Sequence, residues 1–260
     1  MIQITGYFFA VLIGFLLGIL GGGGSILTIP VLVYFFDIDP LVATTYSLFI
    51  VGLTAVSGSI SNYRVRNVDH RAAALFGAPS VTMLFIVRKW LINFIPQTIF
   101  RSGDLIITKS IFLMIVFSFL MLICGLSMIK AKTYLPSKEK RSSTRLIIQG
   151  CITGAITGFI GIGGGFIIVP SLVLFAGLPM KKAIGTSLTI IAINCVVGLL
   201  SNFGAVQGLN FVFLLTFSAL AIPGMLAGTF TTKFFPDKRM KFIFGWVILA
   251  MSVIVLLKVL

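Results

Sequence analysis

The sequence predicts an all-α, polytopic membrane protein that is built from two homologous halves. The chain of 260 residues is 58% hydrophobic and has a mean hydropathy of +1.14. Apolar segments of roughly 17–25 residues, the length that spans a bilayer, recur from end to end. An apolar segment interrupted by glycines also recurs about 140 positions after its first occurrence. We therefore expect one membrane transport domain over residues 1–260, with a first repeat 1–130, a basic linker 131–145 and a second repeat 146–260.

Each half opens with an apolar segment that glycines interrupt. The two segments are Ile4–Phe36 and Leu146–Phe175, their glycine runs are Gly21–Ser25 and Gly161–Gly165, and the runs are followed by Pro30 and Pro170. Each glycine inside a helix costs about 1 kcal/mol relative to alanine, so we expect the helix to end at the run. Backbone outside a helix must be paired within the protein or line a cavity when it lies in lipid. Paired interruptions of this kind are typical of a transport site.

About three spanning helices are expected after the interrupted segment of each half. The predicted helices are Leu41–Asn62, Arg71–Val87 and Leu105–Ile129 in the first half, and Ala183–Asn202, Phe211–Thr232 and Lys241–Val259 in the second. Roughly a third of the positions from Gly14 to Asn62 are identical, without gaps, to those from Gly154 to Asn202, among them most of the glycines together with Pro30 and Asn62, which indicates a duplication. Gly14 and Gly18, with Gly154 and Gly158, have the spacing of close helix contacts.

The Lys and Arg residues predict how the two halves are oriented. If each interrupted segment crossed the membrane once, the 20 basic residues would divide ten to ten between the two sides. If each segment is a helical hairpin that leaves on the side where it entered, they divide fifteen to five, a normal positive-inside bias. Ile26–Phe36 and Phe166–Ala176 are also too short to cross about 30 Å of hydrocarbon. We therefore predict inverted-topology repeats, with both termini outside and the loop 131–145 in the cytoplasm.

A glycine-rich turn that leads into a short helix is typical of an anion site. Several backbone N–H groups point in one direction there, and the positive end of the helix dipole adds to them. Two such turns in inverted repeats would approach the midplane from opposite sides, which suits alternating access. The substrate-binding residues predicted in the turns are Gly21, Gly22, Gly23, Gly24, Ser25, Gly161, Gly163, Gly164 and Gly165.

Polar residues on the next helix of each half are further candidates. Those predicted to bind substrate are Thr45, Ser47, Thr186, Ser187 and Asn194. The alternative for the Ser and Thr residues is capping of the helix N-terminus. Asn194 lies in the middle of its helix, where a buried amide needs partners that are either neighbouring helices or a ligand. Structural roles are predicted for Pro30 and Pro170, which close the glycine runs, and for Asn62 and Asn202, which end helices.

The charged side chains favour an anionic substrate. All six Asp and Glu residues fall in loops or at segment ends, so no carboxylate is placed for a cation site or proton relay inside the membrane. His70 is the only histidine, the residue type that titrates near neutral pH, and we expect it in a solvated basic loop. A coupling ion, H⁺ or Na⁺, is left open.

Enzymatic chemistry is not expected from these residues. One histidine and no acid in the predicted spans leave no Ser/His/Asp or Cys/His set. Cys124, Cys151 and Cys195 lack CxxC spacing and are expected to pack, and no ATPase motif GxxxxGK[ST] is present. We therefore expect no catalytic residue, cofactor or metal site. The net charge of +14 is expected to set topology and contact the lipid bilayer, and not to bind nucleic acid.

The duplicated motif resembles the TauE/SafE sulfite exporter family. It is carried by Gly154 to Pro170, by Ala183 to Leu188 and by Ser201-Asn202, with equivalents in the first half. The resemblance covers nearly the whole chain and implies an inner-membrane carrier for small anions such as sulfite, thiosulfate or sulfoacetate, often moved outward. Gly22 corresponds to Ile162, and the link from Arg88 to Lys109 has no equal in the second half, so the two sites are expected to differ.

The leading function is therefore a secondary transporter of a small sulfur-containing or organic anion. Two alternatives stay open: an anion or small-solute channel, and a non-transport scaffold for an enzyme complex. The sequence does not decide between a monomer and a homo-oligomer.

Overall fold

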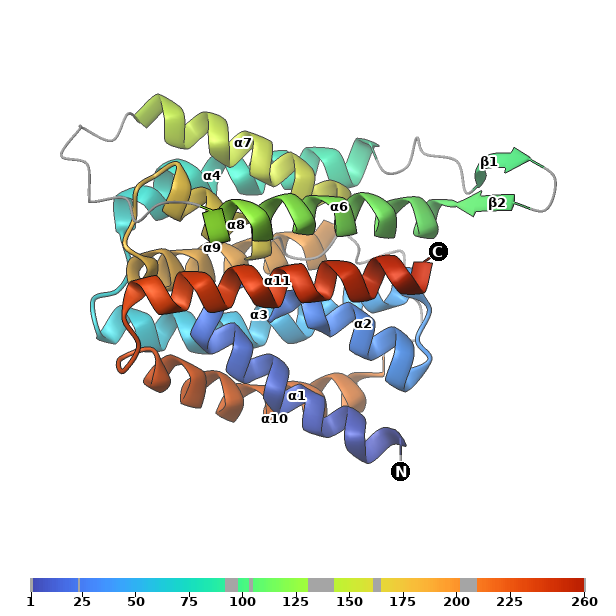
Figure 1. The fold of residues 1–260 in the computed structure, drawn as a ribbon, viewed down its shortest axis with the longest axis horizontal. Helices are drawn as coiled ribbons and strands as arrows, with labels where there is room; N and C mark the ends of the chain where they lie inside the picture. Colours follow the sequence, from blue (N-terminus) through green and yellow to red (C-terminus); the bar gives the residue numbers. More distant parts are fainter. Residues whose placement is uncertain are drawn as a thin grey trace.

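The computed structural model is an all-helical bundle with one small β-hairpin (Figure 1). The structure describes residues 2–22, 24–91, 98–102, 105–130, 143–160, 165–201 and 210–259. The first half contains α1 (Ile2–Leu20), α2 (Ser25–Phe36), α3 (Pro40–Arg64), α4 (His70–Ile86), the π-helical turn η1 (Val87–Leu91), β1 (Thr98–Ser102), β2 (Leu105–Thr108) and α6 (Lys109–Lys130). The second half contains α7 (Ser143–Ile160), α8 (Gly165–Leu174), α9 (Met180–Ser201), α10 (Phe211–Thr231) and α11 (Asp237–Val259).

The predicted fold class, an all-α polytopic membrane protein, is confirmed. Within the described residues, 5 helical segments are long and apolar enough to cross a membrane by length and composition. They are Val42–Arg64, His70–Trp90, Met180–Ser201, Phe211–Thr231 and Asp237–Leu257. The apolar helices α2, with 12 residues, and α8, with 10, are too short to cross about 30 Å.

The start of the helix predicted at Leu105 is corrected by the structure. Leu105–Thr108 forms strand β2, which pairs antiparallel with β1, and α6 begins only at Lys109. Strand β2 contains two isoleucines and a threonine, and β1 begins with threonine, isoleucine and phenylalanine, residue types that favour extended backbone. The hairpin projects from one end of the bundle (Figure 1).

Helix α2 folds back along α1, so the first interrupted segment is a helical hairpin. The Phe36 ring at the end of α2 lies 5.7 Å from the Tyr7 ring near the start of α1, centroid to centroid. The Phe35 and Phe9 rings are 4.7 Å apart in the same way. In the second half α8 lies against α7, with the hydroxyl oxygens of Thr153 and Ser171 3.4 Å apart.

The short helices α2 and α8 end in the same way. Asp37 after α2 has a φ of 54° and Gly177 after α8 has a φ of 61°, so both chains turn through the left-handed region. The N–H of Ile38 then donates to the carbonyl of Leu32 over 3.2 Å, and that of Leu178 donates to Leu172 over 3.0 Å. The two hairpins therefore leave their short helices through equivalent turns.

Helix pairs from the two halves run antiparallel through the centre of the bundle. On α3 and α9, a Cβ at Gly58 would lie 3.2 Å from Leu188, and one at Gly198 would lie 3.3 Å from Leu48. On α6 and α11, the Ser118 hydroxyl lies 2.7 Å from the carbonyl oxygen of Ser252, and the Ser252 hydroxyl 2.8 Å from that of Ser118. In each pair, the contact that the helix of the first half makes with the helix of the second half is matched by an equivalent contact in return.

Helix α1 packs on α10 as α7 packs on α4. A Cβ at Gly14 would lie 2.8 Å from the carbonyl carbon of Ala221, and one at Gly154 would lie 2.7 Å from that of Ser80. Gly18 and Gly158 make the next close approaches one turn later. These four glycines let helix backbones touch, as their spacing predicts.

The two ends of the bundle differ in charge. Figure 1 places both termini, the β1–β2 hairpin and η1 at one end, which we call the terminal end. At the opposite end, the basic end, α3, α6 and α10 finish and α4, α7, α9 and α11 begin. The described basic residues at the basic end are Arg64, Arg66, Arg71, Lys130, Arg145, Lys181, Lys182, Lys233, Lys238, Arg239 and Lys241. Those at the terminal end are Arg88, Lys89, Arg101, Lys109 and Lys258.

Candidate functional site

The two glycine interruptions meet inside the protein. A Cβ at Gly22 would lie 2.7 Å from the Cα of Gly165, and one at Gly165 would lie 2.6 Å from the Cα of Gly22. Contacts this short leave no room for a side chain at either residue. Because α2 begins at Ser25 and α8 at Gly165, the N-termini of both short helices lie near this contact. The positive ends of both helix dipoles would favour an anion, while in the first turn of α2 the N–H groups of Ser25 and Leu27 donate to the carbonyls of Gly22 and Gly24 over 3.2 and 3.1 Å.

Gly21 gives the first turn its shape and joins it to α9. Its φ of 70° lies in the left-handed region, where a residue with a side chain would be strained. The Ser187 hydroxyl of α9 lies 2.8 Å from the Gly21 carbonyl oxygen and 2.8 Å from that of Ile184. Ser187 is fully buried, and its single proton is shared between these two acceptors. The structure thus brings the predicted residues Gly21 and Ser187 together from opposite halves.

Ser25 and Thr28 hold the turn from within. The Ser25 hydroxyl donates to the Gly22 carbonyl over 2.6 Å. The side chains of Ser25 and Thr28 are both fully buried. The Thr28 hydroxyl lies 3.5 Å from the Gly24 carbonyl oxygen. Ser25 is a predicted binding residue, but its hydroxyl proton is used within the turn. Only the lone pairs of its hydroxyl oxygen could therefore interact with a ligand.

Thr186 connects α9 to the loop before α4. Its hydroxyl accepts a hydrogen bond from the Asp69 N–H over 2.9 Å. A Cβ at Gly185, one residue earlier, would lie 3.0 Å from the carbonyl carbon of Asn67 in the same loop. The Asp69 carboxylate caps α4 by accepting from the Ala72 N–H over 3.0 Å. Thr186, predicted to bind substrate, thus fixes the basic-end loop.

Asn194 lies on the face of α9 that also carries Ser187. The positions 187, 191, 194 and 198 are three or four residues apart and share one side of the helix. Asn194 is fully buried, and its Nδ2 donates to the Ser80 hydroxyl of α4 over 3.3 Å. Its Oδ1 has no hydrogen-bond partner within the part of the chain that the structure describes. Asn194 thus joins two helices and also keeps one polar atom for a ligand.

Arg88 continues this face of α9 toward the terminal end. A Cβ at Gly198 would lie 3.4 Å from Nη1 of Arg88. Arg88 is only 7% exposed, although the sequence predicts that the helix ends before it, at Val87. The reason is η1, because its wider π-helical turn continues α4 as far as Leu91 and carries Arg88 into the helix packing. Arg88 is not close in sequence to any of the motifs, so the sequence contains no signal that it contributes to the site.

The equivalent face of α3 is less polar. Ser47, which corresponds to Ser187, is 1% exposed, and Thr45 is 3% exposed. Thr54 stands where α9 has Asn194 and is fully buried, with its hydroxyl bonded to the Ile50 carbonyl. The amide and guanidinium groups on the α9 side therefore give the two approaches to the glycine turns different chemistry.

A cavity of about 330 Å³ opens at the basic end beside Asn62. It is lined by Lys181 and Lys233 as well as by the polar residues Asn67 and Thr229. Asn62 does not end its helix, since α3 continues to Arg64, and its amide donates to the Gly58 carbonyl over 2.9 Å. Two cationic side chains, Lys181 and Lys233, therefore lie in the lining of a cavity at the basic end.

Pro30 and Pro170 lie within α2 and α8 at equivalent positions, as the sequence predicts. Gly24 packs against α1, because a Cβ at this position would lie 2.9 Å from the Cα of Leu17. Five other predicted residues lie outside the described residues: Gly23, Gly161, Gly163, Gly164 and Asn202.

Acidic side chains lie away from this site. Asp37, Asp39, Asp69 and Asp237 are at helix ends, and these are the acids within the described ranges. The same ranges contain no group of three or more His, Cys, Asp or Glu that could hold a metal ion. His70 begins α4, is exposed and stacks edge-on with Tyr63 at 5.5 Å. The site's polar groups are thus backbone, hydroxyl, amide and cationic groups, which suits an anion.

Comparison with known proteins gives a consistent result. A sequence model of the family described as "Sulfite exporter TauE/SafE" matches residues 7–255. A "Probable membrane transporter protein" of Xylella fastidiosa is 30% identical over 253 residues, which cover 94% of this chain and 91% of that protein. Proteins with similar names from Methanocaldococcus jannaschii and Bacillus subtilis are 26% and 27% identical over 82% and 69% of this chain, and over 80% and 70% of their own lengths. No solved structure matches the chain.

Proposed function

The chain belongs to the sulfite exporter TauE/SafE family of membrane transporters, and we propose that it is a secondary transporter of a small anion. In this proposal the anion binds at the paired glycine turns and is exposed to each side of the membrane in alternation. The single observation that carries the proposal is the backbone contact between Gly22 and Gly165. Half-helices that converge near the middle of a membrane domain are the usual construction of such sites.

The inverted orientation of the two halves is part of the proposal. Helices at equivalent positions, α3 with α9 and α6 with α11, make reciprocal antiparallel contacts. Two helices with equivalent places in parallel repeats would run in the same direction. An inverted pair can rock about the glycine contact so that the same site opens first to one end and then to the other.

The charge of the substrate is inferred from the groups that surround its path. Arg88 and Asn194 lie between the terminal end and the turns, and Lys181 and Lys233 border the cavity at the basic end. The guanidinium of Arg88 is only 7% exposed at the end of a membrane span, where ionisable side chains often mark the path of a substrate. An anion that passes Arg88 would gain charge-assisted hydrogen bonds in a place where water competes little.

The family description favours a sulfur oxyanion, so sulfite is the first candidate, with thiosulfate and sulfoacetate next. We propose that transport is outward, across the inner membrane, with the basic end in the cytoplasm. The positive-inside bias supports this placement, because the basic end carries most of the described Lys and Arg residues.

Transport by the full-length protein in liposomes tests the proposal. Liposomes loaded with unlabelled sulfite and diluted into radiolabelled sulfite should accumulate the label by counterflow, and the initial rate should saturate with concentration. A channel would give no counterflow and no saturation. A scaffold would move none of sulfite, thiosulfate or sulfoacetate, and either result would refute the carrier.

A further inference from the structure

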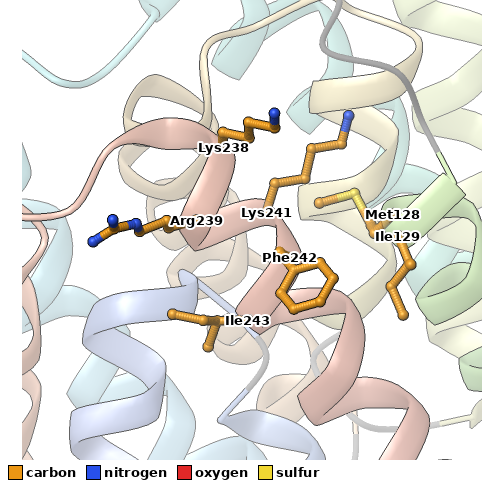
Figure 2. A pocket seen from close by; sticks show the side chains of 7 residues that line it. All are labelled: Met128, Ile129, Lys238, Arg239, Lys241, Phe242 and Ile243. Atoms are coloured by element: carbon orange, nitrogen blue, oxygen red, sulfur yellow. The ribbon is translucent and has the colours of Figure 1, made fainter.

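A second cavity lies at the basic end, between the end of α6 and the beginning of α11 (Figure 2). Its volume is about 550 Å³, and Lys238, Arg239 and Lys241 supply its charged lining. The first turn of α11 adds the positive end of its dipole. The adjacent Asp237 carboxylate is turned to α9, where it accepts a hydrogen bond from the Met180 N–H over 3.2 Å. None of the described residues that line the cavity is acidic.

The rest of the lining is apolar and lies on one side. Figure 2 shows the ammonium groups of Lys238 and Lys241 extended to one side, with Phe242 and Ile129 on the other and Arg239 directed away from them. Phe242 is 55% exposed, and Trp246 one turn further along α11 is 51% exposed, with their rings 6.0 Å apart. A charged rim above an exposed aromatic stripe matches a molecule with an anionic head and an apolar tail.

We propose that this cavity binds a phospholipid with a negatively charged head group. The phosphate would lie between Lys238 and Lys241, and an acyl chain would run along Phe242 and Trp246 toward the membrane centre. Basic pockets between spanning helices on the cytoplasmic side are suited to anionic head groups, which are enriched in that leaflet. A free inorganic anion would use the cations but would leave the aromatic stripe uncovered. The proposal does not depend on the identity of the transported substrate.

The test is thermal unfolding of the purified full-length protein in detergent with added lipid. Phosphatidylglycerol should raise the apparent Tm of the wild type, because a ligand that binds the folded state stabilises it by mass action. Phosphatidylcholine, with its neutral head group, should raise it much less. The shift caused by phosphatidylglycerol should fall by more than half in K238Q/K241Q and should persist in K238R/K241R.

The matched control is R64Q/R145Q, which removes two exposed charges from the same end of the bundle without touching the cavity. This variant should keep the wild-type shift. An equal shift in K238Q/K241Q and the wild type, or an equal shift with phosphatidylcholine, would overturn the proposal. So would an equal shift with glycerol 3-phosphate alone, since a soluble head group would then account for binding.

Discussion

Gly22 and Gly165 bring the two halves of the protein into direct backbone contact, with their Cβ positions 2.7 and 2.6 Å from each other's Cα atoms. Main-chain atoms cannot move aside as the end of a flexible side chain can. The contact therefore requires glycine on both sides.

Gly22→Ala and Gly165→Ala should each abolish sulfite counterflow, because one added methyl group separates the glycine turns. The protein should still insert into the membrane, since the spanning helices are untouched. Gly77→Ala is the control, because a Cβ there would approach only the side chain of Ile190, at 3.3 Å, and not the backbone of another helix. Counterflow in proteoliposomes and the amount of membrane-inserted protein are the measurements. Wild-type counterflow in both glycine variants would show that the glycine turns are not part of the substrate-binding site.

Ser187→Ala should weaken transport through the shape of the first turn. The substitution leaves the Gly21 carbonyl without the hydroxyl that lies 2.8 Å away, and an unsatisfied buried acceptor costs about 1–3 kcal/mol. We expect a lower apparent Tm together with a reduced rate. The control is Ser57→Ala, which removes an exposed hydroxyl that donates to the Leu53 carbonyl of its own helix. It should change neither the Tm nor the transport rate. An unchanged Tm and rate for Ser187→Ala would show that the turn does not need this bond.

The sequence predicts the fold more fully than the site, and the reason is physical. Apolar length, glycine interruptions and charge balance are properties of single segments, so the hairpins and spans are visible along the chain. The contact of Gly22 with Gly165 depends on how two distant segments dock, which no local pattern contains. The duplication and the tally of basic residues still indicate that the two turns approach from opposite sides.

Arg88 and Lys238 illustrate what local patterns miss. Both are basic residues at the ends of apolar segments, and the sequence assigns them the same role in topology. In the structure Arg88 is buried against Gly198, whereas Lys238 is exposed at a cavity rim. The π-helical turn at Val87–Leu91 makes this difference, and its sequence carries no recognisable signature. The sequence also predicts helix where Leu105–Thr108 forms a strand, because the apolar residues of this segment suit either structure.

Both termini should lie on the outer side of the membrane. Figure 1 places them at the end opposite to the end of α3 and the beginning of α11, the elements beside Arg66 and Lys238, and the positive-inside rule assigns that basic end to the cytoplasm. A reporter fused after position 260 should therefore read as external. A single cysteine at position 66 or 238, in a protein without its three native cysteines, should react with an impermeant reagent only from inside. External labelling at either position, or a cytoplasmic reporter, would contradict this orientation.

Arg88→Gln should raise the KM for the transported anion tenfold or more. Charge-assisted hydrogen bonds contribute about 1.5–3 kcal/mol, and tenfold corresponds to about 1.4 kcal/mol. Arg88→Lys keeps the charge but loses the planar pair of donors, so its KM should lie between those of the wild type and Arg88→Gln. The chain offers a close control in Lys89→Gln, which removes an equal charge from an exposed neighbour in the same turn. If Arg88 acts only in packing, both Arg88 variants should lower the Tm and reduce the amount of active transporter without changing KM. Initial rates over a range of sulfite concentrations, measured beside Tm for each variant, separate these two roles.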